Sequence, residues 1–354
     1  MRDPRYAPLV LDHIRRGNFT ARWMPASASG KGKSGRTHTA TIYVLADALM
    51  IEGVRVAVSA ITAQQIGDML GASLHTGRTA DLAWWSRSAT IAPVVLSQTA
   101  ADLNNLTTSA YLLRHSDGVQ AQIDALTPAQ RAGIVRDVGK FWIRTLLLVQ
   151  RPSKGINYGY FSERGPHQCV DVTGPPCRVI QQPGDAHPAN HIDASQMGDW
   201  LLNVVTVDGI PRDLDDVEQD PELWPLFSVE GPMTVHRQPN VPAPKGPSVI
   251  LPAIVASPAT SCPDPGLGRV AGAVPYLGGR AGALLAWSRA IEDAYPLGTV
   301  ARDTVDGLPF IGRVECEREG ASWRKATRLY VPARYDAQGT LTARTSPPPG
   351  WPGS

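Results

Sequence analysis

The sequence predicts an α+β protein: a mixed or antiparallel sheet with short helices, followed by a smaller C-terminal helix-and-hairpin domain. Three observations lead to this fold class. Several segments are rich in β-branched residues and alternate in polarity, which is typical of strands. Short runs with helical spacing follow capping residues. The chain also contains 33 glycines and 31 prolines among 354 residues, so turns and loops should be abundant.

Length and composition divide the chain into five segments. A chain of 354 residues is long enough for two domains. The run SASGKGKSGRTHT near the N-terminus offers no apolar anchor, and the prolines between residues 238 and 265 mark a boundary. We therefore expect a basic flexible arm (1–38), a main α+β domain (40–240), a Pro-rich linker (241–265), a small C-terminal domain (266–335) and a disordered tail (336–354).

The first half of the main domain is predicted to hold a hairpin and three helices. Glu52 and Gly53 form a turn signal between two alternating segments. Thr62 and Gln65 have the spacing of a capping box, and the Thr-Pro pair at 127–128 is a typical helix start. We expect strands at 40–51 and 54–61, and helices at 62–70, 79–89 and 127–138.

The second half of the chain reads mainly as strands and loops. Residues 141–150 are apolar enough for a strand or a helix, and Gly139 before them favours a strand. The pairs Asp208-Gly209 and Asp306-Gly307 are hairpin turn signals. We expect strands at 141–150, 156–161, 177–182, 200–207 and 328–331, a helix at 281–294 and a hairpin at 299–317.

Charge and hydropathy argue against two classes of protein. The 34 basic and 32 acidic side chains leave a net charge of +2, which does not indicate nucleic-acid binding. No apolar stretch is long enough to predict a membrane span, and no signal peptide is recognisable at the N-terminus. The eight acidic residues between Asp208 and Glu230 read as a solvated loop.

The four cysteines are predicted to form disulfides. Cys169 and Cys177 bracket VDVTGPP, a turn-like segment that a disulfide would close, and Cys262 could then pair with Cys316. Free buried thiols are the alternative, and the spacings do not suit a cysteine zinc site. Disulfides would imply an oxidising environment, outside the cytoplasm or in a virion.

The segment DAHPANHIDASQMGDW at 185–200 holds the candidate site. His187, His191 and Asp193 lie within seven residues beside Ser195, and His167 lies twenty residues before His187. Imidazole titrates near neutrality and a carboxylate fixes its tautomer, so these side chains suit general acid–base catalysis. His187 would be the base, Asp193 its orienting carboxylate, and Ser195 a nucleophile or hydrogen-bond donor.

Two other interpretations of this segment stay open. A divalent metal such as zinc could be bound by His187, His191, Asp193 and His167, although the proline after His187 disfavours the helix that a His-x-x-x-His site needs. The third interpretation is a polar loop whose histidines form only local hydrogen bonds.

The order INYGYF, VIQQ, His187 and HIDASQ resembles the Y-G-aromatic, I-Q, H, D-Y-S pattern of a group of uncharacterised bacterial proteins. Tyr158, Gly159, Gln181, His187, Asp193 and Ser195 match that pattern, and Ala194 replaces its usual Tyr. The resemblance covers residues 40–235 and supplies no established reaction. Some of these proteins are cell-wall associated. The resemblance therefore implies that His187, Asp193 and Ser195 form a site, and that the substrate belongs to the cell envelope.

The leading hypothesis is a hydrolase of a cell-envelope polymer such as peptidoglycan, phage-borne or secreted. Its partner would be an envelope polysaccharide or peptide, and Tyr158 would contact the substrate or an oxyanion. The alternative is a non-catalytic structural or binding protein, such as a virion or secretion-particle component. In that case the arm and the Pro-rich connector would serve assembly with other proteins.

Overall fold

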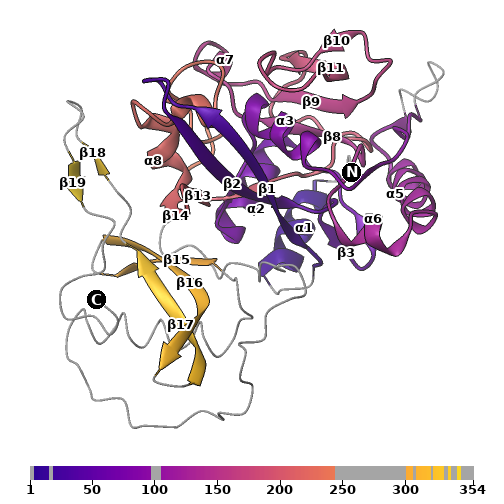
Figure 1. Cartoon of the computed structure of the whole chain (residues 1–354). Coiled ribbons are helices and arrows are strands. Elements are labelled where there is room, and N and C mark those ends of the chain that lie inside the picture. The colour runs from indigo at the N-terminus through magenta and orange to yellow at the C-terminus, as the bar shows by residue number, and fades with distance from the viewer. Residues whose placement is uncertain are drawn as a thin grey trace.

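The computed structural model describes residues 4–15, 19–96, 105–243, 300–305, 308–319, 322–330, 334–335 and 341–343. It confirms the α+β class, with helices and mostly antiparallel sheets (Figure 1). The helices are α1 (Tyr6–Arg15), α2 (Ala60–Leu70), α3 (Gly77–Trp85), α5 (Ser109–Asp124), α6 (Pro128–Ala132), α7 (Leu147–Gln150), α8 (Leu214–Gln219) and the 3-10 turn η1 (Trp224–Leu226).

Two antiparallel sheets organise residues 4–243. The first has the order β14-β13-β2-β12-β5, with β1 paired to β2, and the second has the order β10-β11-β9-β8. The first sheet contains β1 (Trp23–Lys31), β2 (Thr37–Leu45), β5 (Ala72–Ser73), β12 (Leu201–Leu202), β13 (Val204–Val207) and β14 (Ile210–Asp213). The second contains β8 (Lys140–Ile143), β9 (Ile156–Phe161), β10 (His167–Gln168) and β11 (Arg178–Gly184).

The remaining strands form small pairs and a C-terminal hairpin sheet. The short pairs are β3 (Met50–Ile51) with β4 (Val54–Arg55), and β6 (Ala89–Thr90) with β7 (Val135–Arg136) in parallel. The C-terminal strands are β15 (Val300–Val305), β16 (Leu308–Glu319), β17 (Ser322–Tyr330), β18 (Arg334–Tyr335) and β19 (Leu341–Ala343). The predicted hairpin strands at 299–317 are confirmed, because β15 and β16 pair antiparallel from Val300↔Arg313 to Val305↔Leu308.

Helix α3 lies between the two large sheets. Leu82 and Ala83 pack with Ile42 and Val44 of β2, whereas Trp84 packs with Phe161 of β9. Figure 1 shows α3 between the β1–β2 pair and the sheet that contains β8 and β9. Both sides of this helix are therefore covered by a sheet, which makes it the centre of the domain.

Helix α2 covers the other face of the first sheet. Its apolar side chains pack with Tyr43 and Leu45, the β2 residues that alternate with Ile42 and Val44. Burial on both faces explains why this strand is apolar almost without interruption. The buried Trp200 indole donates a hydrogen bond to the Ala63 carbonyl, which ties the helix to the sheet.

The expected flexible arm is ordered over much of its length, which corrects the prediction for residues 1–38. Strand β1 pairs with β2 from Trp23↔Leu45 to Lys31↔Thr37. Trp23 is fully buried and packs with α1 residues such as Leu11. The Gly/Ser/Lys run lacks apolar residues because it lies along the exposed end of a hairpin, where backbone hydrogen bonds hold it.

Most local signals are confirmed, with shifted boundaries. Helix α2 begins at Ala60, two residues before Thr62, because Ser59 caps it: the Ser59 hydroxyl accepts a hydrogen bond from the Thr62 amide. The capping box at Thr127 is present, but α6 ends before Gly133. The apolar segment 141–150 divides into the end of β8 and α7. The expected helix at 281–294 lies outside the described residues, and β19 falls within the predicted disordered tail.

The acidic segment after Asp208 is not a solvated loop, which corrects another expectation. Asp213 caps α8, whose Glu218 is fully buried. Both carboxylate oxygens of Glu218 accept hydrogen bonds of 2.8 Å from Arg144, which is also fully buried. A buried carboxylate needs such a bidentate partner. The partner lies 74 residues away, so local sequence could not reveal it.

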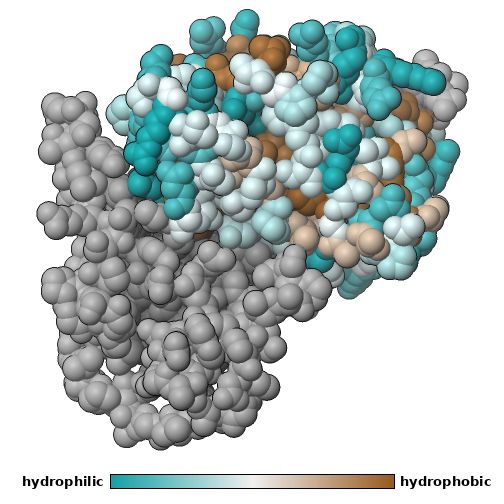
Figure 2. Space-filling model, viewed as in Figure 1, coloured by the Kyte–Doolittle hydropathy of each residue, from teal (hydrophilic) through white to brown (hydrophobic). Residues whose placement is uncertain are grey.

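The surface of the described residues mixes apolar and polar side chains. No helix in the described part of the chain is long and apolar enough to cross a membrane. On the face shown in Figure 2, apolar residues reach the surface in separate patches between polar ones. The most exposed apolar side chains come from different elements and include Leu9, Leu113, Val149 and Val172.

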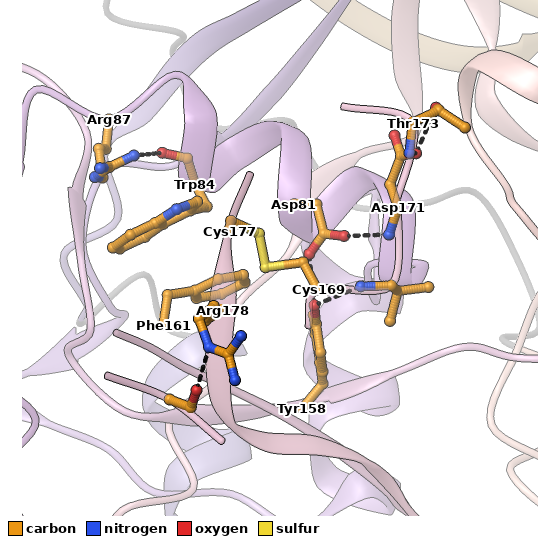
Figure 3. The surroundings of a disulfide bond; sticks show 12 residues. Asp81, Trp84, Arg87, Tyr158, Phe161, Cys169, Asp171, Thr173, Cys177 and Arg178 are labelled. Atoms are coloured by element: carbon orange, nitrogen blue, oxygen red, sulfur yellow. Dashed lines mark hydrogen bonds between the residues drawn. A yellow bond between two sulfur atoms is a disulfide. The ribbon is translucent and has the colours of Figure 1, made fainter. Parts of the chain in front are cut away.

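The predicted Cys169–Cys177 disulfide is confirmed, with a Cα–Cα distance of 5.5 Å (Figure 3). It closes the loop between β10 and β11 beside α3 and β9. The other predicted pair cannot be followed, since Cys262 lies outside the described residues.

Candidate functional site

The candidate site is built on a loop, residues 187–196, that lies against the start of β8. The Gly155 amide donates to the His187 carbonyl, and the Lys140 amide donates to the Ser195 carbonyl at 2.8 Å. Gly139 permits this close approach, because a Cβ there would lie 2.7 Å from the Ser195 carbonyl oxygen. The loop is therefore held along both of its ends by the second sheet.

Three side chains contact the Asp193 carboxylate, and a fourth stacks on one of them. Ser195 donates its hydroxyl hydrogen to Oδ1 at 2.6 Å. The Lys140 ammonium lies 3.2 Å from Oδ2, and the His191 Nε2 atom lies 3.6 Å from the same oxygen. The His187 ring stacks on the His191 ring with centroids 3.9 Å apart. His187 thus reaches the carboxylate through His191, which is the imidazole nearest to Asp193.

Burial and charge set the protonation of this group. Burial by itself would raise the pKa of Asp193, but the hydrogen bond from His191 and the charge of Lys140 hold it well below its ordinary value. Asp193 is therefore ionised at neutral pH. The pKa of His187 is lowered by burial and by the neighbouring His191 and Lys140. A neutral His187 at physiological pH follows, with a ring nitrogen able to accept a proton.

Two residues that sequence reasoning missed extend the cluster inward. The Tyr160 hydroxyl lies 3.3 Å from Nε2 of His115, on α5. A hydrogen bond with Ser195 acts to lower the Tyr160 pKa, although burial dominates and raises it. Burial lowers the pKa of His115 to about 4, so this imidazole is neutral as well. The polar side chains therefore continue from His191 through Asp193, Ser195 and Tyr160 to the fully buried His115.

The backbone of β9 is distorted at this cluster. Gly159 and Tyr160 both have positive φ, 131° and 53°. Positive φ is uncommon for an aromatic residue and costs on the order of 1–3 kcal/mol. Gly159 pairs with Lys140 on one side and with Gln181 on the other. Gly159 and Gln181, which belong to the INYGYF…VIQQ pattern, are thus cross-strand neighbours in line with Lys140.

Asp137 supports this distortion and provides a pH test. Its carboxylate accepts a 2.7 Å hydrogen bond from the Phe161 amide, directly after Tyr160. Burial raises the pKa of Asp137 to about 7, against the opposing effects of that hydrogen bond, Arg136 and Arg87. In the unfolded chain the carboxyl ionises near its ordinary 3.8, so the folded state binds the extra proton between these values. The stability from this group is lost as pH rises from about 4 to 7, by about 1.4 kcal/mol per pH unit.

Asp137→Asn should therefore gain stability relative to the native chain as pH rises. The amide oxygen can still accept from Phe161, and Asn tolerates the φ of 73° at this position. Urea unfolding of both chains at pH 5 and pH 8 measures the difference. An equal difference in unfolding free energy at the two pH values would show that Asp137 is ionised at both.

Two of the predicted site residues lie elsewhere. The Tyr158 hydroxyl donates to Asp81 Oδ1 at 2.6 Å beside the disulfide (Figure 3), and its side chain is fully buried. Alternate strand residues point to opposite faces, so Tyr158 faces away from the row that contains Gly159. His167 lies in β10, the edge strand opposite β8. Three strand spacings separate the two edges, about 14 Å.

The arrangement does not fit the expected zinc site. The imidazole planes of His187 and His191 are 7° from parallel. Because the nitrogen lone pairs lie in those planes, they run side by side and do not converge on one ion. Lys140 already neutralises Asp193. Among the described residues, only Asp81–Cys169–Cys177 and Asp215–Glu218–His236 bring three potential ligand atoms within 4.8 Å of one another.

Comparison of the chain with protein-family models, curated proteins and solved structures found no match. Tyr160 stood in the sequence as the aromatic residue of the Y-G-aromatic pattern. His115 could have been found through helical spacing, since Leu112, His115 and Val119 share the buried face of α5. Lys140 had no local signal, because only the packing of residues 187–196 against β8 brings it to Asp193.

Proposed function

We propose that this chain is a hydrolase of a cell-envelope polymer such as peptidoglycan, and that His187 and His191 are its general acid–base pair. One observation carries the proposal: His191 lies between an ionised carboxylate and a second imidazole with a lowered pKa. Both histidines are partly exposed, whereas Asp193 beneath them is buried. A partly exposed imidazole that is oriented by a buried carboxylate is an arrangement suited to proton transfer.

Each side chain has a distinct role in this proposal. Neutral His187 accepts a proton from the attacking water. Asp193 holds the His191 ring in place, so that His191 can donate a proton to the leaving group. Lys140 is the cation beside this pair and would stabilise negative charge that develops on the substrate.

Ser195 serves as a hydrogen-bond donor in this mechanism and not as the nucleophile. Its hydroxyl donates to Asp193, whose lowered pKa makes it a poor base for activating an alcohol. The Ser195 hydroxyl thus donates to a carboxylate and not to an imidazole. Ser195 therefore positions Asp193.

The substrate class is inferred from two features. The resemblance of the INYGYF…HIDASQ pattern to cell-wall-associated bacterial proteins points to an envelope polymer. The Cys169–Cys177 disulfide favours an oxidising location, such as the cell exterior or a virion. Both features agree with a secreted or phage-borne enzyme.

The test is an assay of the purified full chain on peptidoglycan sacculi, with released fragments identified by mass spectrometry. We expect soluble fragments from the native chain and from His167→Ala, a matched histidine control at the far edge of the second sheet. His187→Ala should release none above background. Because His187 must be neutral and its pKa is lowered, the native rate should fall in acid, at a pH below the ordinary histidine pKa. No fragments from any envelope polymer would instead favour a structural or binding role.

A further inference from the structure

A second cluster lies on the other side of β9 and is independent of the proposed hydrolase. An oxygen of Asp81 and the sulfur atoms of Cys169 and Cys177 lie within 4.8 Å of one another. Figure 3 shows the Asp81 carboxylate directed toward the disulfide, with Tyr158 beside it. Two sulfurs and one carboxylate form a ligand set that thiophilic divalent cations accept.

Asp81 is held in place by neighbours that do not involve sulfur. It is fully buried on α3, and its two oxygens accept hydrogen bonds from the Tyr158 hydroxyl and from the Asp171 amide. A carboxylate oxygen has two lone pairs, so each can still bind a cation.

The loop that carries the cysteines is also held by contacts that survive loss of the disulfide. The Val170 amide donates to the Tyr158 hydroxyl, and the Asp171 carboxylate pairs with Arg78 on α3. The Cys169 amide donates to the Cys177 carbonyl at 3.2 Å. Reduction should therefore leave both sulfurs next to Asp81 rather than release the loop.

We propose that Cys169, Cys177 and Asp81 bind one thiophilic divalent cation such as Zn²⁺ when the disulfide is reduced. A dithiol or phosphine reductant supplies the two electrons that break the S–S bond and is itself oxidised, and each sulfur gains a proton. Cation binding then displaces both thiol protons to solvent, leaving two thiolates as ligands. Cys177 is partly exposed, so a water molecule can complete the four ligands.

The site would act before the disulfide forms. Metal binding would hold the reduced loop in its folded position and protect both thiolates, and oxidation would release the ion. Cation binding and disulfide formation are mutually exclusive states of the same two sulfurs. This makes the oxidised chain the control for the reduced one.

The experiment titrates Co²⁺ alone into the full chain, reduced with a phosphine under anaerobic conditions and then desalted. We expect one ion per reduced chain with thiolate-to-cobalt charge-transfer absorption, displacement by Zn²⁺, and no such absorption in the oxidised chain. Cys177→Ser should abolish the absorption. Asp81→Asn should weaken Co²⁺ binding at least tenfold, and circular dichroism checks that each variant is folded.

Three results would overturn the proposal. The reduced chain could lose its fold, which would show that the loop contacts do not hold without the disulfide. It could stay folded and bind no Co²⁺. It could also bind Co²⁺ in a way that Cys177→Ser leaves unchanged, which would place the ion elsewhere, for example at Asp215, Glu218 and His236. None of these results depends on the hydrolase assay.

Discussion

Asp193→Asn is expected to lower turnover by about 10²–10⁴-fold, the range over which positioned acid–base groups contribute. The amide carries no negative charge beside His191, and it cannot neutralise Lys140 3.2 Å away. The substitution should also cost about 1–3 kcal/mol of stability, because it leaves a charged partner poorly satisfied. Turnover and the free energy of unfolding must therefore be measured on the same preparation.

A double variant tests whether the cluster acts as one unit. His187→Ala combined with Asp193→Asn should be no slower than the slower single variant, since members of a catalytic unit are not additive. Asp185→Asn is the matched control. The Asp185 carboxylate is exposed and forms an ion pair of 3.3 Å with Arg151, which is also exposed. Full activity of folded Asp193→Asn would remove this carboxylate from the mechanism.

Deletion of residues 1–35 is expected to abolish folding at 25 °C. The deletion removes β1 from the six-stranded sheet and α1 from the first core. Loss of the Trp23 side chain by itself should cost about 3–5 kcal/mol. Typical domains have an unfolding free energy of about 5–15 kcal/mol. The loss of the other α1 and β1 contacts should therefore exceed the stability that remains.

Two point variants separate the effect of side-chain packing on stability from the effect of shortening the chain. Trp23→Ala should lower the unfolding free energy by the amount given above. Ser29→Ala lies on the same strand, is exposed and should change it little. Thermal and urea unfolding of the native chain, the two point variants and the truncated chain provide the comparison. A truncated chain with a native melting temperature would show that residues 1–35 are dispensable after all.

The sequence by itself determined the elements whose signals are local. Turns with positive φ occur at Glu52–Gly53 and Asp208–Gly209, where the sequence predicts them. Thr127 caps its helix, and Cys169 bonds to Cys177 across eight residues. These features depend on contacts within a few residues, so neighbouring side chains are enough to specify them.

Tertiary structure decided what depends on distant partners. Glu218 is buried because Arg144 meets it, and Lys140 joins Asp193 because Gly139 lets residues 187–196 approach β8. The sequence marked His187, Asp193 and Ser195 as a group, but in the fold the imidazole beside the carboxylate is that of His191. Strand alternation turned Tyr158 toward Asp81 and away from the group. Burial and partner choice follow from which remote segments pack together, and no local pattern encodes that.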